Sequence, residues 1–199
     1  DPVPIDVVEA TMPHLGAPVA AMVRLQLLTG MRPGEVCIMR RCDVDEARSP
    51  WIYAPDSHKT EHHGKARKIP IGPKAQALLA EWFEKGAGNP SAYLFSPAEW
   101  AVERKRLRRA ARKSKVQPSQ VDRSKPGGRK RPPKDRYDAG SYRQAVTRAA
   151  KAAKQPHWHP NQLRHTYATI VRARYGLEAS QVLLGHASAD VTEIYAERD

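Results

Sequence analysis

Apolar residues recur at helical spacing along most of the chain and predict most of its secondary structure. The first such stretch runs from about 15 to 28, where Leu15, Val19, Met22, Val23 and Leu27 share one face. Further helices are predicted over about 34–39, 74–84, 103–112, 141–154, 162–174 and 177–184, and a last one carries Tyr195. Residues 1–13, which are rich in proline, are expected to form an extended lead-in.

Two short stretches have the composition of strands instead. Residues 51–53 are aromatic and β-branched, residues 67–71 contain two isoleucines, and a polar stretch at 56–64 separates them. We therefore expect a hairpin or small sheet there, and a short buried segment at 93–95. The predicted fold class is mainly α with a small antiparallel β-sheet (α+β), in one domain over residues 1–199.

The charge of the chain favours a polyanionic partner. Its 34 lysines and arginines against 21 acidic residues give a net charge of +13, which points to DNA or RNA, although ribosomal and membrane-surface proteins share this property. Cys37 and Cys42 fit neither a zinc site nor a disulfide framework and are expected to be free thiols. We see no membrane span or signal peptide and expect a cytoplasmic, nucleoid-associated protein with no membrane partner.

A strongly basic block follows the middle of the chain. The predicted helix there carries four closely spaced arginines, which are candidates for DNA binding: Arg104, Arg106, Arg108 and Arg109. Residues from about 113 to 136 are then dominated by Ser, Pro, Gly, Lys and Arg and are expected to form a flexible basic insertion. A solvated linker and an arm that meets DNA phosphates explain this composition equally well.

Cutting a DNA strand without metal or water requires particular residue types. A nucleophile must attack the phosphorus, fixed donors must hold its two non-bridging oxygens, and the leaving sugar oxygen needs a proton. Arginine suits the oxygens because its planar, permanently charged fork matches two of them at once. Lysine or histidine suits the proton transfer. Tyrosine suits the attack because its phosphodiester keeps the energy of the broken bond.

Four short motifs supply these residue types in order. They are TGMRPGE at 29–35, SHKT at 57–60, NQLRHTYAT at 161–169 and LGH at 184–186, and Tyr195 follows nine residues after His186. In order, spacing and flanking residues this set closely resembles the tyrosine recombinases (phage integrases). That family shows TG-x-R-x-x-E, a hairpin lysine, H-x-L-R-H-T-x-A-T, LGH and then a tyrosine. The resemblance covers most of the chain and implies the tyrosine recombinase catalytic-domain fold.

The resemblance gives each matching position a role. Arg32 and Arg164 correspond to the two arginines that clamp the phosphate. Glu35 corresponds to the acidic residue that supports the first arginine, and a helix places positions three apart side by side. The remaining roles are the proton donor to the leaving 5′-oxygen, the later histidine that contacts the phosphate, and the nucleophile that takes the 3′-phosphate; their positions are Lys59, His186 and Tyr195.

The sequence departs from the family pattern at one position. The family usually has histidine three residues before its second arginine, and here that position is Asn161. Asparagine can donate a hydrogen bond to a phosphate oxygen but cannot transfer a proton near neutral pH. His159 or His165 could compensate. Otherwise His165 is expected to be a buried helix histidine with a structural or supporting role.

Rival residues exist for two of these roles. Lys65 and Lys68 compete with Lys59 as proton donor, and we prefer Lys59 because it follows the first strand most closely. Tyr167 and Tyr175 are alternatives to the C-terminal tyrosine, but the first of them is expected in the core. The histidines of the hairpin loop lack a ligand framework, so no metal site is expected; they are His58, His62 and His63.

The resemblance implies a site-specific DNA recombinase that cleaves and rejoins strands through a 3′-phosphotyrosyl intermediate, without metal, ATP or another cofactor. A type IB topoisomerase uses much the same residues, and a non-catalytic DNA-binding protein would explain the charge. The expected partner is double-stranded DNA. Only 31 residues precede Arg32, so we expect the N-terminal core-binding domain to be absent from this chain. The full-length protein is expected to form a homo-oligomer, a tetramer, on DNA, and this fragment to be monomeric.

Overall fold

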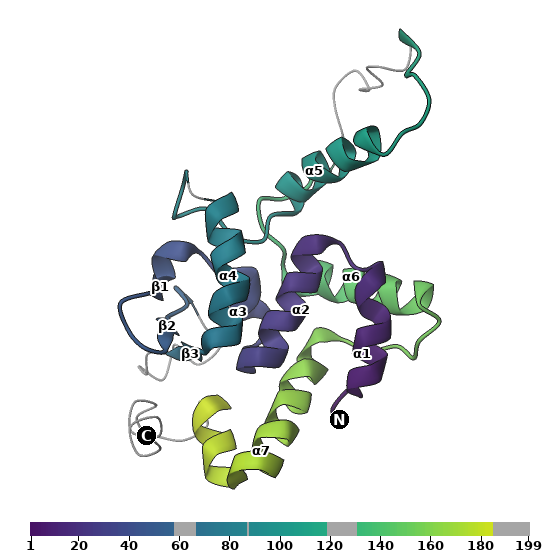
Figure 1. The fold of residues 1–199 in the computed structure, drawn as a ribbon. Coiled ribbons are helices and arrows are strands. Elements are labelled where there is room, and N and C mark those ends of the chain that lie inside the picture. Colours follow the sequence, from purple (N-terminus) through teal and green to yellow (C-terminus); the bar gives the residue numbers. More distant parts are fainter. Residues whose placement is uncertain (58–66, 87, 119–130, 185–199) are drawn as a thin grey trace.

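A computed structural model describes residues 1–57, 67–86, 88–118 and 131–184, apart from the side chain of Gln181 (Figure 1). In these ranges helices pack together with one small antiparallel sheet at the side of the molecule, which confirms the predicted fold class. The elements are α1 (Ile5–Thr11), η1 (Met12–His14), α2 (Ala17–Thr29), α3 (Pro33–Cys37), η2 (Arg41–Asp43), β1 (Val44–Asp45), β2 (Trp51–Tyr53), β3 (Ile69–Ile71), α4 (Pro73–Lys85), α5 (Pro97–Ala110), α6 (Ala139–Ala152) and α7 (Pro160–Leu184).

Helix α2 forms the centre of the core. Met22, Val23 and Leu25 are fully buried, and α2 packs against α7, α4, α3 and α6. A helix that is apolar nearly all round must be covered on every side, and Figure 1 shows α2 between the sheet side and the α1–α6 side of the molecule. Residues far apart in sequence therefore meet around the C-terminal end of α2.

The sheet has three antiparallel strands in the order β1-β2-β3. Tyr53 pairs with Ile69, and Trp51 pairs with Ile71, as expected for the two predicted strands. The two-residue strand β1 was not predicted, because a pair of residues carries no periodicity. Tyr53 and both isoleucines are fully buried, so the sheet packs its inner face on the core.

The expectation of an extended segment at residues 1–13 was wrong. This stretch forms α1 and η1, with Pro4 just before the first helical turn. Tertiary contacts stabilise it: Val8 is buried, α1 packs on α6, and Trp158 Nε1 donates a hydrogen bond to Thr11 Oγ1 at 3.2 Å. Proline before a first turn is compatible with a helix, and that favourable position outweighed the general bias of proline against helices.

Helix α7 consists of two pieces, as the sequence predicts. Gly176 has a non-helical backbone (φ 90°, ψ 175°) and separates the part that begins at Pro160 from the part that ends at Leu184. The first part runs along α2, and Thr166 Oγ1 bonds the backbone N–H and carbonyl of Val3 at 2.9 and 2.8 Å. The N-terminus and α7 therefore support each other.

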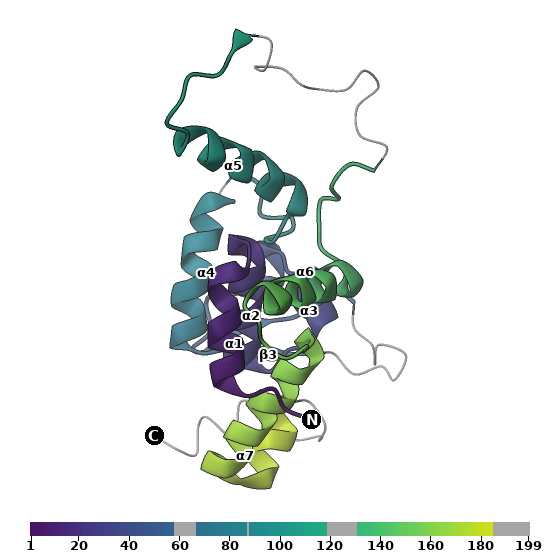
Figure 2. The same ribbon diagram turned by 90° about the vertical axis from the view of Figure 1, so that its right-hand side faces the viewer.

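Helix α5 projects away from the rest of the molecule, at the opposite end from α7 in both views (Figures 1 and 2). Ser96 caps its start by accepting a hydrogen bond from the Glu99 N–H at 3.2 Å. Val102 is 71% exposed, which shows how little covers this helix. The chain returns to the body where the Lys134 carbonyl accepts a hydrogen bond from the Ala98 N–H at 3.1 Å.

Both cysteines are free thiols, as predicted, with Cys37 buried and Cys42 exposed. Burial raises the pKa of Cys37 to about 12, so its thiol stays protonated at neutral pH. None of the helices within the described ranges is long and apolar enough to cross a membrane.

We predict that Gly30→Ala destabilises the chain by about 1–3 kcal/mol. Gly30 ends α2 with φ +64°, which disfavours any side chain, and a Cβ there would collide with the ring of Tyr167. Urea unfolding should show the loss. The matched control is Gly34→Ala, because no atom lies within 4 Å of a Cβ at Gly34 and its φ is not positive. Equal stability of the two variants would contradict this role of Gly30.

Candidate active site

Arg32 and Glu35 form the first part of the site at the start of α3. Arg32 precedes the helix, and Pro33 occupies its first position, where the missing N–H costs nothing. Glu35 Oε2 accepts a hydrogen bond from the Arg32 backbone N–H at 2.6 Å, and Glu35 Oε1 accepts one from Arg32 Nη1 at 3.0 Å. The Glu35 side chain is 2% exposed and that of Arg32 is 24% exposed. The carboxylate therefore fixes both the backbone and the guanidinium of Arg32.

Arg67 is a member of the site that the sequence analysis missed. Its Nε donates to Glu35 Oε1 at 3.3 Å, so one carboxylate joins two arginines from different elements. Arg67, Ile69 and Ile71 are all buried, whereas Lys68 is exposed. Arg67 thus lies two residues before β3 on the buried side of the chain; its position two before Ile69 was the signal in the sequence, although Pro70 is buried too.

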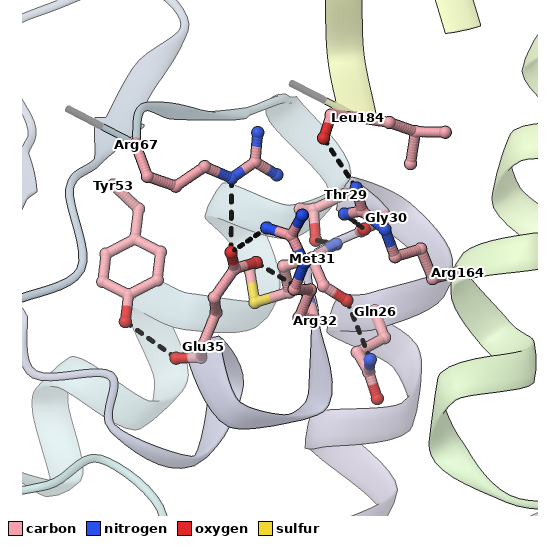
Figure 3. A network of polar contacts seen from close by, with 10 residues as sticks. All are labelled: Gln26, Thr29, Gly30, Met31, Arg32, Glu35, Tyr53, Arg67, Arg164 and Leu184. Carbon is pink, nitrogen blue, oxygen red and sulfur yellow. Dashed lines mark hydrogen bonds and ion pairs between the residues drawn. The ribbon is translucent and has the colours of Figure 1, made fainter. Parts of the chain in front are cut away.

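Arg164 approaches from α7 and is also buried. Its Nη1 donates to the Gly30 carbonyl and its Nη2 to the Leu184 carbonyl, both at 2.6 Å. It therefore joins the loop before Arg32 to the end of α7. Figure 3 shows the three guanidinium groups gathered on one side of the Glu35 carboxylate.

Buried hydrogen bonds also hold the loop between α2 and α3. Gln26 Nε2 donates to the Met31 carbonyl at 2.8 Å, and Tyr142 Oη donates to Gln26 Oε1 at 2.9 Å. On the other side of α3, Tyr53 Oη donates to the Glu35 carbonyl at 2.7 Å. No sequence pattern marks Gln26, Tyr53 or Tyr142 as parts of the site, because these contacts depend on how the elements pack.

The site has more positive than negative charge. Within the described ranges, Glu35 is the carboxylate of this cluster; it pairs with Arg32 and Arg67, and its charge also acts on Arg164. Burial first, and then the charges of Arg32 and Arg67, lower the pKa of Arg164 to about 10. Burial also lowers the pKa of Arg67, while Glu35 opposes that shift. Guanidinium groups donate to oxygens in pairs, so the arrangement favours an anion that accepts several hydrogen bonds.

Asn161, the position that differs from the family pattern, lies on α7 near two histidines that could take over its role. Asn161 is exposed, and its Nδ2 lies 3.5 Å from Nε2 of His165. His165 is itself exposed, so the expectation of a buried histidine was wrong; it lies on the outer face of α7, next to buried Arg164 and Thr166. His159 is half-buried, and burial, followed by the charge of Arg143, lowers its pKa.

Three of the five predicted catalytic residues, Lys59, His186 and Tyr195, lie outside the described residues, as do Lys65 and the hairpin histidines. Of the rival side chains, Tyr167 is half-buried beside Gly30, and Tyr175 is 45% exposed. In the described part of the chain, no three His, Cys, Asp or Glu side chains come together as a metal site would require. That no metal is used stays a prediction.

The four arginines predicted to bind DNA lie on α5 and are exposed: Arg104, Arg106, Arg108 and Arg109. Arg106 pairs with Glu103 at 2.7 Å on the surface. The neighbouring described parts of the basic insertion, 113–118 and 131–136, are almost entirely exposed.

We predict that Glu35→Gln destabilises the chain by about 3–5 kcal/mol, because it leaves two buried or half-buried arginines without their counter-charge. Urea unfolding at neutral pH measures this. The control is Glu46→Gln, which breaks an exposed pair with Arg41 and should cost under about 1 kcal/mol. If both variants lose the same small amount, the buried carboxylate does not hold the site together.

Comparison with known proteins identifies similar chains. Tyrosine recombinase XerC of Chromohalobacter salexigens is 28% identical over 214 residues, covering 100% of this chain and 57% of that protein. Tyrosine recombinase XerC of Pseudomonas putida strain F1 is 31% identical over 142 residues, covering 68% of this chain and 35% of that protein. The chain thus spans little more than half the length of the first of these relatives, and about a third of the second.

Solved structures show the same fold. The lambda integrase catalytic core matches with a TM-score of 0.59 and 16% identity, covering 96% of this chain and 94% of that one. The XerA recombinase matches with a TM-score of 0.58 and 22% identity, covering 100% of this chain and 60% of that one. A profile described as the phage integrase family matches residues 6–199. The chain therefore belongs to the phage integrase family, and its fold is that of the integrase catalytic domain.

Proposed function

We propose that residues 1–199 are the single catalytic domain of a site-specific DNA recombinase, which cleaves and rejoins strands through a 3′-phosphotyrosyl intermediate. The observation that carries this proposal is a cluster of three buried or half-buried arginines near one carboxylate; they lie just before α3, just before β3 and in α7. Such a cluster suits a phosphodiester, whose two non-bridging oxygens each accept several hydrogen bonds.

In this proposal the guanidinium groups of Arg32 and Arg164 hold the two non-bridging oxygens. The phenol oxygen of Tyr195 attacks the phosphorus and loses its proton, the bond to the 5′-oxygen breaks, and Lys59 gives that oxygen a proton. His186 contacts the same phosphate. The reverse sequence rejoins a strand, because the tyrosyl phosphodiester keeps the energy of the broken bond. No step requires a metal ion or ATP.

Asn161 takes the place of the usual histidine as a hydrogen-bond donor to the phosphate. It is exposed and can reach a ligand, but it has no proton to transfer near neutral pH. The lowered pKa of His159 keeps that ring neutral at physiological pH, so it would act as a donor rather than as a cation. The exposed ring of His165, beside Asn161, can donate in the same way.

The arginines of α5 are proposed to contact DNA phosphates away from the cleaved one, since α5 and α7 lie at opposite ends of the molecule. The proposed partner of the whole protein is double-stranded DNA, bound by a homotetramer. A solved structure of the same fold that supports this is described as a lambda integrase tetramer bound to a Holliday junction. This chain alone is proposed to be monomeric.

We predict that the chain forms a covalent adduct with a nicked duplex that carries its target site, and that Tyr195→Phe abolishes the adduct, because only the phenol oxygen can form the bond. A denaturing gel detects the adduct, and Tyr175→Phe is the control that should retain it. A type IB topoisomerase would relax plasmids without recombining two sites. A DNA-binding protein without catalysis would form no adduct with any DNA.

We also predict that replacing Arg104, Arg106, Arg108 and Arg109 with glutamine weakens binding to long duplexes. The slope of log K against log salt should fall in magnitude by about 0.9 for each phosphate contact that is lost. Fluorescence anisotropy over a salt series measures the slope. The control replaces four exposed cations elsewhere with glutamine, namely Arg24, Arg48, Arg148 and Lys151. Equal slopes for the two variants would assign α5 no specific part in DNA binding.

A further inference from the structure

The side chain of Arg67 has a buried donor that nothing in its described surroundings satisfies. The side chain is 6% exposed, its Nε is bonded to Glu35, and its Nη2 is buried without a hydrogen-bond partner among the described residues. An unsatisfied buried donor costs about 1–3 kcal/mol, and more when the group is charged. A native structure retains such a group only when something else supplies the acceptor.

The nearby acceptors already have donors. Glu35 Oε2 accepts from the Arg32 backbone, and Glu35 Oε1 accepts from both Arg32 and Arg67. The carbonyls of Gly30 and Leu184 each accept from Arg164. None of these oxygens accepts a hydrogen bond from Arg67 Nη2, so among the described residues the cluster leaves this donor available for an added acceptor.

The charges of the cluster indicate what kind of acceptor this is. Among the described residues, three guanidinium groups carry +3 and Glu35 carries −1, which leaves an excess of +2 in this largely buried group. These positive charges repel one another, since the charge of Arg32 lowers the pKa of both Arg67 and Arg164. An anion would reduce this repulsion and would also give Arg67 Nη2 an oxygen to bind. A neutral carbonyl would give it the oxygen but would not reduce the repulsion.

We propose that Arg67 is a third phosphate-binding arginine, whose Nη2 donates to the same phosphate that Arg32 and Arg164 hold. The inference rests on the proposed function, because it takes the anion to be a DNA backbone phosphate. Arg67 then has two roles that use different atoms. Its Nε shares Glu35 with Arg32, and its Nη2 binds an oxygen that gains charge as the phosphorus is attacked.

The first test uses inorganic phosphate and needs no DNA cleavage. Phosphate at about ten times its dissociation constant should raise the melting temperature of the wild-type chain by about 3–6 °C relative to chloride of equal ionic strength. Arg67→Gln should lose most of this rise. Arg48→Gln, which makes the same charge change on the surface, should retain it. A phosphate-induced rise in Arg67→Gln equal to that of wild type, or none in wild type, would overturn the inference.

Arg67→Lys keeps the proposal testable if Arg67→Gln does not fold, as checked by circular dichroism. Lysine keeps the charge but cannot bind Glu35 and the phosphate at the same time through a planar fork. It should show a clearly smaller phosphate-induced rise than wild type. A rise equal to that of wild type would mean that Arg67 contributes only its charge, and the proposed hydrogen bond would be wrong.

The second test separates binding the phosphate from shaping the site. On an ordinary scissile phosphate, Arg67→Gln should slow release of the 5′-hydroxyl strand on the order of 100-fold. On a scissile methylphosphonate, which has no negative charge, wild type and variant should differ far less. An equal loss on both substrates would make Arg67 merely structural. If wild type cleaves neither substrate, the proposed function fails, and the phosphate titration still decides the inference about Arg67.

Discussion

One buried carboxylate determines how the positive charges of this molecule are arranged. Glu35 accepts hydrogen bonds from the backbone and side chain of Arg32 and from the side chain of Arg67, and it is itself almost inaccessible to water. Buried like charges repel strongly because little solvent screens them. Arg32 and Arg67, which lie just before α3 and β3, can therefore lie close together because both bind this carboxylate. The excess positive charge that remains is what makes the cluster suitable for a phosphate.

The turn after α2 and its contacts with α7 determine where Arg32 lies. Helix α2 ends at Gly30, whose left-handed backbone turns the chain directly into the Arg32 segment. Gln26 and Arg164 hold successive carbonyls of this turn, those of Met31 and Gly30. Arg164 also holds the Leu184 carbonyl, so the same side chain connects the turn to the end of α7. A movement of α7 relative to α2 would therefore shift the turn that positions Arg32.

Much of this organisation could be predicted from sequence, because it is local. Helical periodicity gave most of the helices, Gly176 interrupts α7 between the two predicted pieces, and the spacing of Arg32 and Glu35 implied that they would touch. Helix α1 could not be predicted in this way, because it has only seven residues between flanking prolines and is stabilised by packing on α6.

The site was harder to predict than the fold. Arg67 was read only as part of a strand, whereas it lies just before β3 and is buried beside the carboxylate of Glu35. The exposure of His165 depends on how α7 is rotated against α2, which is a tertiary property. The network from Tyr142 through Gln26 to the Met31 carbonyl joins residues more than a hundred positions apart, and no local pattern marks such a pair.

The central claim is that the arginine cluster is the binding site for one DNA phosphate. A crystal structure of Tyr195→Phe with a duplex carrying the target site tests it most directly, because the variant can bind DNA but cannot form the covalent bond. We expect one backbone phosphate within hydrogen-bond distance of Arg32 and Arg164, beside the Glu35 carboxylate. A duplex bound elsewhere, with this cluster facing no phosphate, would contradict the account.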